Sequence, residues 1–265
     1  MRIAWATDIH LNFLNEQKRE TFFHSTLEHN SDAVFITGDI AEAPTLSFHL
    51  QEMVEFIQQP LYFVLGNHDY YYGAITSVRN ATEKLCVSQQ NLTYLTGNRV
   101  IELTKKTALV GHDGWGDGRL GNIEQTSVRL NDFRLIEELT GLEYRKLIGK
   151  LRELGDEAAA LIQDTLSNAL DTYDHVIFLT HVPPFKESCW YEGRVGNDDW
   201  LPFFTCKAVG DVLYELMKCR THSRLTVLCG HTHNEGIAQI LPNLRVVTGS
   251  ADYGVPHVQE VLEID

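Results

Sequence analysis

Long apolar runs are missing from this sequence of 265 residues. No uninterrupted apolar stretch approaches the ~18 residues that a membrane-spanning helix requires, so we expect no contact with a membrane. No basic segment followed by a long apolar stretch opens the sequence, which argues against a secretory signal. Cysteine is also sparse: the five residues are scattered and none belongs to a Cys-x-x-Cys pair. This usage favours reduced thiols and a cytoplasmic location.

Positive charge is scarce. The chain has 22 lysines and arginines against 36 acidic residues, which gives a net charge of −14. Nucleic-acid binding depends largely on neutralising phosphates, so this balance argues against a nucleic-acid partner. The richest basic stretch, Arg145 to Arg152, is interleaved with apolar positions at helical spacing and indicates a solvated helix face. Bound metal ions could still supply a local positive field, so a small phosphorylated substrate remains compatible. The sequence says nothing of the oligomeric state.

The hydrophobic pattern predicts one α/β domain over residues 1–265, because no Pro/Gly/Ser-rich linker divides the chain. Short apolar runs predict buried strands, and helical periodicity separates the first three of them. The expected strands are 2–7, 33–37, 61–65, 99–103, 107–111, 176–180, 225–229, 236–241, 244–248 and 258–264, and the expected helices are 15–30, 45–58, 74–87 and 207–220. The last three strands look antiparallel, which predicts mixed sheets.

Two segments interrupt this pattern. Residues 122–172 form a polar and amphipathic stretch, which we interpret as a helical insertion of two or three helices broken at Gly141, Gly149 and Gly155. Residues 183–204 are irregular and rich in proline, glycine and aromatic side chains, and we interpret them as a possible lid.

Metal-ligating residue types follow five of the expected strands. They occur in Asp8-Ile9-His10, Gly38-Asp39, Gly66-Asn67-His68-Asp69, Thr180-His181-Val182 and Gly230-His231-Thr232-His233. Open α/β sheets place their binding sites at the carboxyl ends of strands, so we expect these loops to meet. Each residue taken alone could be a turn former or a packing residue, and it is their combination that indicates a site.

The residue types indicate a two-metal hydrolytic centre. Carboxylates, imidazoles and one amide suit Mn, Fe, Co, Ni or Zn, and the absence of cysteine argues against a closed structural zinc site. Two such ions ~3.5–4 Å apart can clamp the attacking and leaving oxygens of an in-line displacement on phosphorus. A metal-bridging water with a lowered pKa would then be the nucleophile.

The ordered motifs D-x-H, G-D, G-N-H-D, a lone His and G-H-x-H resemble the calcineurin-like metallophosphoesterase superfamily over residues 8–233. The resemblance implies a four-layer α/β/β/α sandwich with two mixed sheets. It also implies that one metal ion is held by Asp8, His10, Asp39 and His233, and the other by Asp39, Asn67, His181 and His231. His68 would be the non-ligand catalytic histidine, and Glu42, at a position where the family more often has Asp, would orient it.

The residues that bind substrate are less defined. Aromatic and basic side chains near the motifs give His112, Trp115, Arg119 and Arg194 as candidates. An arginine could hold a phosphate oxygen, and an aromatic ring could stack on a leaving group. The alternative is that His112 lies in a plain flexible loop and that the aromatic residues pack the lid against the helical insertion.

We expect a hydrolase of small phosphomonoesters or phosphodiesters, with a metal-bridging hydroxide as nucleophile and His68 assisting the leaving group. A Ser/Thr protein phosphatase is one alternative, but that branch has G-D-x-V-D-R-G, and this chain has Ala43 in place of the arginine. A nuclease shares the G-N-H-D form, and the acidic charge balance argues against it. A non-catalytic scaffold that binds partner proteins is the third alternative, although this chain keeps every histidine of the motifs.

Overall fold

The structure, a computed structural model, describes all residues from Met1 to Asp265. In the first part of the chain, strands alternate with helices. The elements are β1 (Arg2–Ala6), α1 (Glu16–Glu28), β2 (Ala33–Thr37), α2 (Ala43–Ile57), β3 (Leu61–Val64), α3 (Ile75–Ser88) and β4 (Leu92–Tyr94), with short 3-10 turns η1 (Leu11–Phe13) and η2 (His68–Tyr70). Strands β1 to β4 are parallel, and the last strand, β13 (Glu260–Glu263), pairs antiparallel with β1. The sheet order is therefore β13-β1-β2-β3-β4.

The second sheet has six strands in the order β11-β12-β10-β7-β6-β5. Its members are β5 (Ile101–Glu102), β6 (Thr107–Gly111), β7 (His175–Leu179), β10 (Arg224–Cys229), β11 (Gly236–Leu241) and β12 (Leu244–Thr248). The four inner strands are parallel, and the two edge strands β5 and β11 run antiparallel to their neighbours. Both sheets are thus mixed, as predicted.

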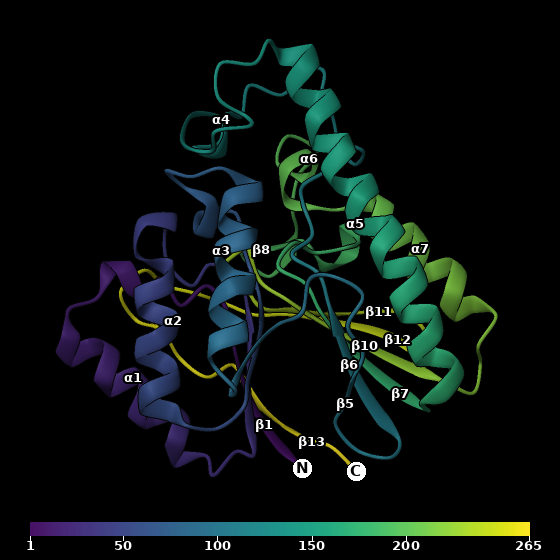
Figure 1. Cartoon of the computed structure of the whole chain (residues 1–265). Helices are drawn as coiled ribbons and strands as arrows, with labels where there is room; N and C mark the ends of the chain where they lie inside the picture. Colours follow the sequence, from purple (N-terminus) through teal and green to yellow (C-terminus); the bar gives the residue numbers. More distant parts are fainter.

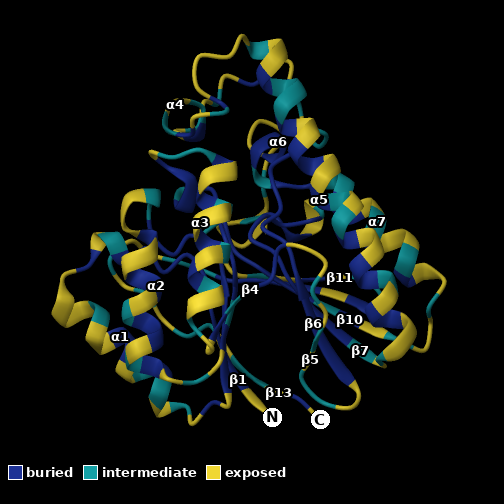
Figure 2. Ribbon diagram, viewed as in Figure 1, coloured by how far each residue is buried: buried dark blue, intermediate teal, exposed yellow.

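The two sheets face each other, and helices cover both outer faces (Figure 1). Strand side chains alternate between two apolar layers: Ile3 and Trp5 of β1 and Phe35 of β2 lie between the sheets, whereas Ala6 and Ile36 face α1, α2 and α3. The second sheet buries its other face against α5 (Tyr144–Thr172) and α7 (Lys207–Lys218). Because these strands are buried on both faces, they appear in the sequence as short runs of consecutive apolar residues (Figure 2). The fold is the four-layer α/β/β/α sandwich.

The helical insertion differs in one respect from the prediction. It contains the short helix α4 (Asp132–Leu135) and then α5, which continues through Gly149 and Gly155 without a break. A Cβ atom at position 155 would lie 2.5 Å from Cβ of Asp117, so this glycine permits close packing rather than ending the helix. The interpretation of Gly149 and Gly155 as helix breaks was wrong. Helix α4 and the first turns of α5 lie beyond the carboxyl ends of the strands (Figure 1).

The segment 183–204 is more regular than expected. It contains the 3-10 turn η3 (Lys186–Ser188), a hairpin of β8 (Trp190–Tyr191) and β9 (Arg194–Val195), and the short helix α6 (Leu201–Phe204). None of the helices of the molecule combines the length and the apolar composition needed to cross a bilayer.

Candidate metal centre

The five motif loops meet at one edge of the sandwich, beyond the carboxyl ends of parallel strands from both sheets. Backbone hydrogen bonds join them: the amide of Asp8 donates to the carbonyl of Gly38 (3.0 Å), and that of Gly230 donates to the carbonyl of His181 (3.0 Å). The carboxylate of Asp8 accepts from the amide of His231 at 3.1 Å, which links the first sheet to the second. Side chains more than two hundred positions apart are thereby fixed in one site.

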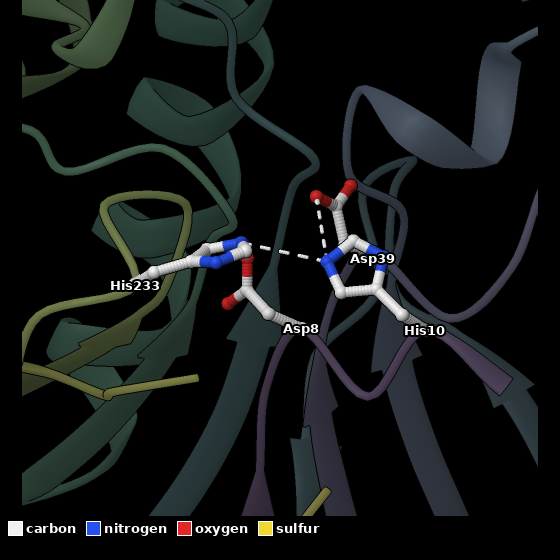
Figure 3. Close-up of side chains that lie close together, drawn as sticks. All are labelled: Asp8, His10, Asp39 and His233. Carbon is white, nitrogen blue, oxygen red and sulfur yellow. Dashed lines mark hydrogen bonds and ion pairs between the residues drawn. The ribbon is translucent and has the colours of Figure 1, made fainter. Parts of the chain in front are cut away.

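One group of ligand atoms comes from Asp8, His10, Asp39 and His233 (Figure 3). The four atoms all lie within 4.8 Å of one another. Nε2 of His10 is 3.4 Å from Nε2 of His233, which in turn is 3.3 Å from Oδ1 of Asp8. Two imidazole nitrogens and two carboxylates that face one another at these distances fit a divalent cation.

A second group lies beside the first. Nε2 of His181 is 3.1 Å from Oδ1 of Asn67 and 3.4 Å from Oδ1 of Asp39. The ring of His231 lies against that of His181, with centroids 4.9 Å apart. The structure therefore brings together every residue that the resemblance assigned to the two metal ions.

Asp39 divides its carboxylate between the two groups. Its Oδ1 is directed to His181 at 3.4 Å, and its Oδ2 lies 3.8 Å from Nε2 of His10. The backbone amide of His68 donates to Oδ1 at 2.9 Å and holds this orientation. A carboxylate oriented in this way can contact two cations at once, one through each oxygen.

Backbone carbonyls fix which nitrogen each of two histidines presents. Nδ1–H of His181 donates to the carbonyl of Thr37 (2.8 Å), which directs Nε2 towards Asn67 and Asp39. Nε2–H of His231 donates to the carbonyl of Phe203 (3.1 Å), which leaves its Nδ1 as the free nitrogen. Second contacts of this kind orient histidines that ligate metals.

Five of the seven ligand candidates have left-handed backbone conformations. The φ angles are 49° at Asp8, 42° at His10, 51° at Asp39, 70° at His231 and 55° at His233. This region is uncommon for residues other than glycine, and such strain concentrates at functional sites. The hydrogen bonds between the loops maintain it here.

Two motif glycines are required by close approach of the ligands. A Cβ atom at Gly66 would lie 2.1 Å from Oδ1 of Asp39, and one at Gly230 would lie 2.0 Å from Oδ2 of Asp8. Any larger residue would displace these carboxylates. The glycines of G-N-H-D and G-H-x-H thus make room for the carboxylates of Asp39 and Asp8 on neighbouring loops.

The buried charges of the site balance one another. Burial acts to raise the pKa of Asp8, but the charge of His181 and a hydrogen bond with His233 lower it to about 2. Burial lowers the pKa of His10 to about 4 and, together with the charge of His181, that of His231 to about 3. Burial acts against protonation of His181 too, but the charge of Asp39 raises its pKa to about 10. The carboxylates are therefore ionised, and His10 and His231 are neutral, which are the states that bind cations. His181 is protonated beside Asp39, and a cation would have to displace its proton to bind there.

His68 lies at the mouth of this cluster. Its ring packs on Tyr71 with centroids 4.3 Å apart, and its Nε2 is 4.0 Å from Oδ2 of Asp39. Its Nδ1 has no hydrogen-bond partner. Glu42, which the resemblance gave as the orienting residue, precedes α2 as its N-cap and makes no side-chain hydrogen bond there. The expected Glu42–His68 pair is thus not formed in this structure.

Sequence reasoning missed Asp132, at the start of α4. Its buried carboxylate accepts hydrogen bonds from Nδ2 of Asn67 (2.9 Å) and from the hydroxyl of Tyr71 (2.7 Å). These bonds turn the amide of Asn67 so that its oxygen faces His181. No motif marks this position, because Asp132 belongs to the helical insertion and meets Asn67 only in the folded chain.

The four residues expected to bind substrate lie away from the open pocket in front of the ligands. This pocket has a volume of about 400 Å³ and is lined by Asp39, Asn67, His68, Tyr71, Leu130, Asn131, Asp132, Tyr191, Phe204, His231, Thr232, His233, Asn234 and Tyr253. His112 is buried, and its Nδ1 accepts from the amide of Gly114. Trp115 is buried behind the site, where it lines a cavity of only about 10 Å³. Arg119 is held by Asp117 and Asp156, and Arg194 is exposed on the hairpin.

Beneath the site, Asp113 has a supporting role that the sequence did not reveal. Its carboxylate accepts from the hydroxyls of Tyr70 and Tyr94, each at 2.6 Å, and from Nε of Arg79 at 3.1 Å. Its carbonyl accepts from the amide of His181 at 3.0 Å. Asp113 therefore ties the loop after β6 to the first sheet and supports His181 from below.

The family model of calcineurin-like phosphoesterases matches residues 1–235, most of the chain. The protein is a calcineurin-like phosphoesterase. No curated protein sequence matches it. This phosphoesterase is therefore a metal-dependent enzyme; the family implies a dinuclear metal site, and the donor set described above fits that requirement.

Solved structures share the fold of this phosphoesterase at low sequence identity. The phosphopantetheinyl hydrolase of Mycobacterium tuberculosis is 13% identical, with a TM-score of 0.66 over 95% of this chain and 89% of that chain. A dimetal phosphatase from Danio rerio is 10% identical, with a TM-score of 0.57 over 98% of this chain and 88% of that chain. The protein TT1561 of Thermus thermophilus is 14% identical, with a TM-score of 0.53 over 94% and 88% of the two chains.

Proposed function

We propose that this phosphoesterase hydrolyses a small phosphate ester with two metal ions, one held by Asp8, His10, Asp39 and His233 and the other by Asp39, Asn67, His181 and His231. The observation that carries the proposal is the position of Asp39, whose two oxygens face two separate groups of nitrogen and oxygen atoms. Mn, Fe, Zn, Ni and Co all suit such ligands. When bound, such ions lower the pKa of a water and offset the charge of the phosphate.

The protein's own residues have distinct roles in this proposal. His68, at the mouth of the cluster and partly exposed, supplies a proton to the leaving oxygen or donates a hydrogen bond to the phosphate. Tyr71 packs on its ring and limits its movement. Asp132 holds the amide of Asn67 with its oxygen directed to the metal side. The helical insertion thereby contributes a residue to the site rather than only covering it.

The lack of basic side chains in the pocket favours a small substrate over a phosphorylated protein. No lysine or arginine lines the pocket in front of the ligands, and the position after Glu42 is Ala43. A Ser/Thr protein phosphatase of this superfamily would have an arginine there to bind phosphate. The unpaired state of all five cysteines supports a reducing, cytoplasmic location. We propose that residues 1–265 form one domain in which the segments 122–172 and 183–204 border the site.

An activity screen with Mn²⁺ tests this proposal. We expect the wild-type protein to hydrolyse p-nitrophenyl phosphate or bis-p-nitrophenyl phosphate, and His68→Ala, with unchanged metal content, to hydrolyse neither at a comparable rate. Preference for the diester would identify a phosphodiesterase, and preference for the monoester a phosphatase. A protein that binds two metal ions per chain and turns over neither ester, nor any other phosphate ester offered, would contradict the proposal.

A further inference from the structure

A second pocket opens beside the metal centre. It has a volume of about 380 Å³ and is lined by Cys189, Trp190, Tyr191, Gly196, Asn197, Trp200, Phe204 and Thr232. We propose that this pocket binds an uncharged aromatic leaving group, so that the substrate is a phosphate ester of an aromatic or arylalkyl alcohol. The inference rests on the proposed function and names the substrate class of that site.

The pocket is continuous with the metal centre. Tyr191, Phe204 and Thr232 line both this pocket and the one that contains the ligand residues. The ring of Phe204 stacks on His231 with centroids 4.4 Å apart, and Trp200 packs edge-on against Phe204 at 5.6 Å. A group attached to a phosphate at the metal centre would therefore reach this pocket directly.

The walls suit an apolar ring. None of the eight lining residues is charged, and four of them are aromatic. Trp200 and Tyr191 are 46% and 52% exposed, although large aromatic side chains are normally covered. Aromatic rings prefer offset or edge-on contact with one another, and a phenyl ring inserted here would meet rings on more than one side.

The same walls disfavour a second phosphate group. Neither pocket has a lysine or arginine in its lining. The site instead presents the carboxylates of Asp39 and Asp132. A diphosphate or a nucleoside triphosphate would bring negative charge that no side chain pairs with. The lining therefore favours one phosphate group with an uncharged substituent.

The pocket wall is attached to the metal-binding loop. The amide of Glu192, in the turn of the β8–β9 hairpin, donates to Oδ1 of Asn234 at 3.0 Å, next to His233. The hydroxyl of Thr248 donates to the carbonyl of Ser188 at 2.8 Å. These bonds fix the hairpin relative to the ligands. Hydrolysis would break the P–O bond, place the oxygen of water on phosphorus and leave the neutral aromatic alcohol in this pocket.

The test compares 2-phenylethyl phosphate with ethyl phosphate on the Mn²⁺-loaded protein. Both esters release a primary alkoxide of similar basicity, so a difference in kcat/KM reports contact with the ring. We expect kcat/KM to be about 10- to 100-fold higher for 2-phenylethyl phosphate, the range given by burying one phenyl ring. In Trp200→Ala this ratio should fall about tenfold, and Tyr191→Ala should lower it in the same direction. Tyr214→Ala, which removes an exposed ring of α7 outside both pockets, should leave it unchanged.

Binding provides a readout that does not require turnover. Calorimetric titration with 2-phenylethylphosphonate and ethylphosphonate should show the same preference in the wild-type protein and its loss in Trp200→Ala. Equal kcat/KM values for the two esters, or a ratio unaffected by both Trp200→Ala and Tyr191→Ala, would overturn the proposal. If neither ester is hydrolysed but the phosphonate preference is present, the aromatic pocket stands and the proposed function fails.

Discussion

The carboxylate of Asp132 accepts a hydrogen bond from the side-chain amide of Asn67 at 2.9 Å. We predict that Asp132→Ala weakens binding of one of the two metal ions about 10- to 100-fold, because a freed amide no longer presents its oxygen in a fixed direction. Asp132→Asn keeps an acceptor and should lose less. Calorimetric titration with Mn²⁺ measures both affinities. Asp164→Ala removes an exposed carboxylate of α5 and is the matched control. Equal loss at both metal sites, or none, would contradict the role of Asp132.

His68 is expected to act on the reaction and not on metal content. His68→Asn should lower kcat by about 10²- to 10⁴-fold, the usual effect of removing a proton donor. Metal analysis should still find two ions per chain, since the imidazole of His68 belongs to neither ligand group. His222→Asn, at an exposed position far along the chain, is the control. Wild-type turnover in His68→Asn would remove this histidine from the mechanism.

Asp39 is expected to be the residue on which both metal ions depend. Asp39→Asn replaces one charged oxygen with an amide and removes the charge that both ligand groups share. We predict that the variant holds fewer than two ions per chain after dialysis and that added Mn²⁺ no longer raises its melting temperature, because stabilisation by a ligand follows its affinity. Asp164→Asn should behave as wild type. Two tightly bound ions in Asp39→Asn would refute the bridging assignment.

The contact between Glu42 and His68 is absent from this structure, and substitution of Glu42 shows whether it forms during turnover. No hydrogen bond joins its side chain to His68, whose Nδ1 has no partner. We therefore expect Glu42→Gln to lower kcat far less than His68→Asn does. A double-mutant cycle of the two changes measures their coupling. If Glu42→Gln matches His68→Asn in effect, and adds nothing in its presence, then Glu42 orients this histidine in the working enzyme.

Acidification should destabilise the fold through His112. Burial lowers the pKa of this histidine to about 4. The nearby charge of Arg79 also acts to lower this pKa, whereas the charges of Asp113 and Glu157 act to raise it. The unfolded chain takes up a proton on this histidine near pH 6.5, and the folded chain does not. The contribution of His112 to the free energy of unfolding is therefore fully present above pH 6.5 and is lost as the pH falls towards 4. Between pH 7 and pH 5 we expect a loss of about 2 kcal/mol from this residue.

Chemical denaturation of the metal-free protein measures this effect. His112→Asn keeps a polar side chain but cannot take up the proton, so its stability should fall less between pH 7 and pH 5 than that of the wild type. His222→Asn should follow the wild-type curve. Parallel curves for wild type and His112→Asn would mean that His112 does not titrate in this range.

The core elements and the residues that meet at the candidate metal centre could be predicted because each depends on local sequence. Strands such as β2 and β10 are buried on both faces, and they therefore appear as short apolar runs whose ends mark the loops. The ligands follow those ends within one to four residues. The likeness of the motifs to those of the superfamily then supplied the pairing of ligands, which spacing alone does not give.

The surroundings of the ligands could not be predicted, because they depend on contacts between distant segments. Arg119 looked available for phosphate, but the fold places Asp117 and Asp156 against it. Trp115 looked like a pocket wall and is instead packed into the core behind the site. Asp132 carries no motif and acquires its role only when α4 is placed over Asn67. Gly155 of α5 was misread because helix periodicity does not show that Asp117 packs against it. Gly149 has no neighbour at its Cβ position, and the helix simply tolerates it.

The pairing of β13 with β1 has a consequence for synthesis on the ribosome. Until residues 260–263 have emerged, β1 is an edge strand whose backbone groups on one side have no partner. Its side chains Ile3 and Trp5 also await the second sheet, which supplies the other half of their apolar layer. Until both partners are in place, the nascent chain therefore exposes an unpaired strand edge and an apolar sheet face, two features that favour association with other chains.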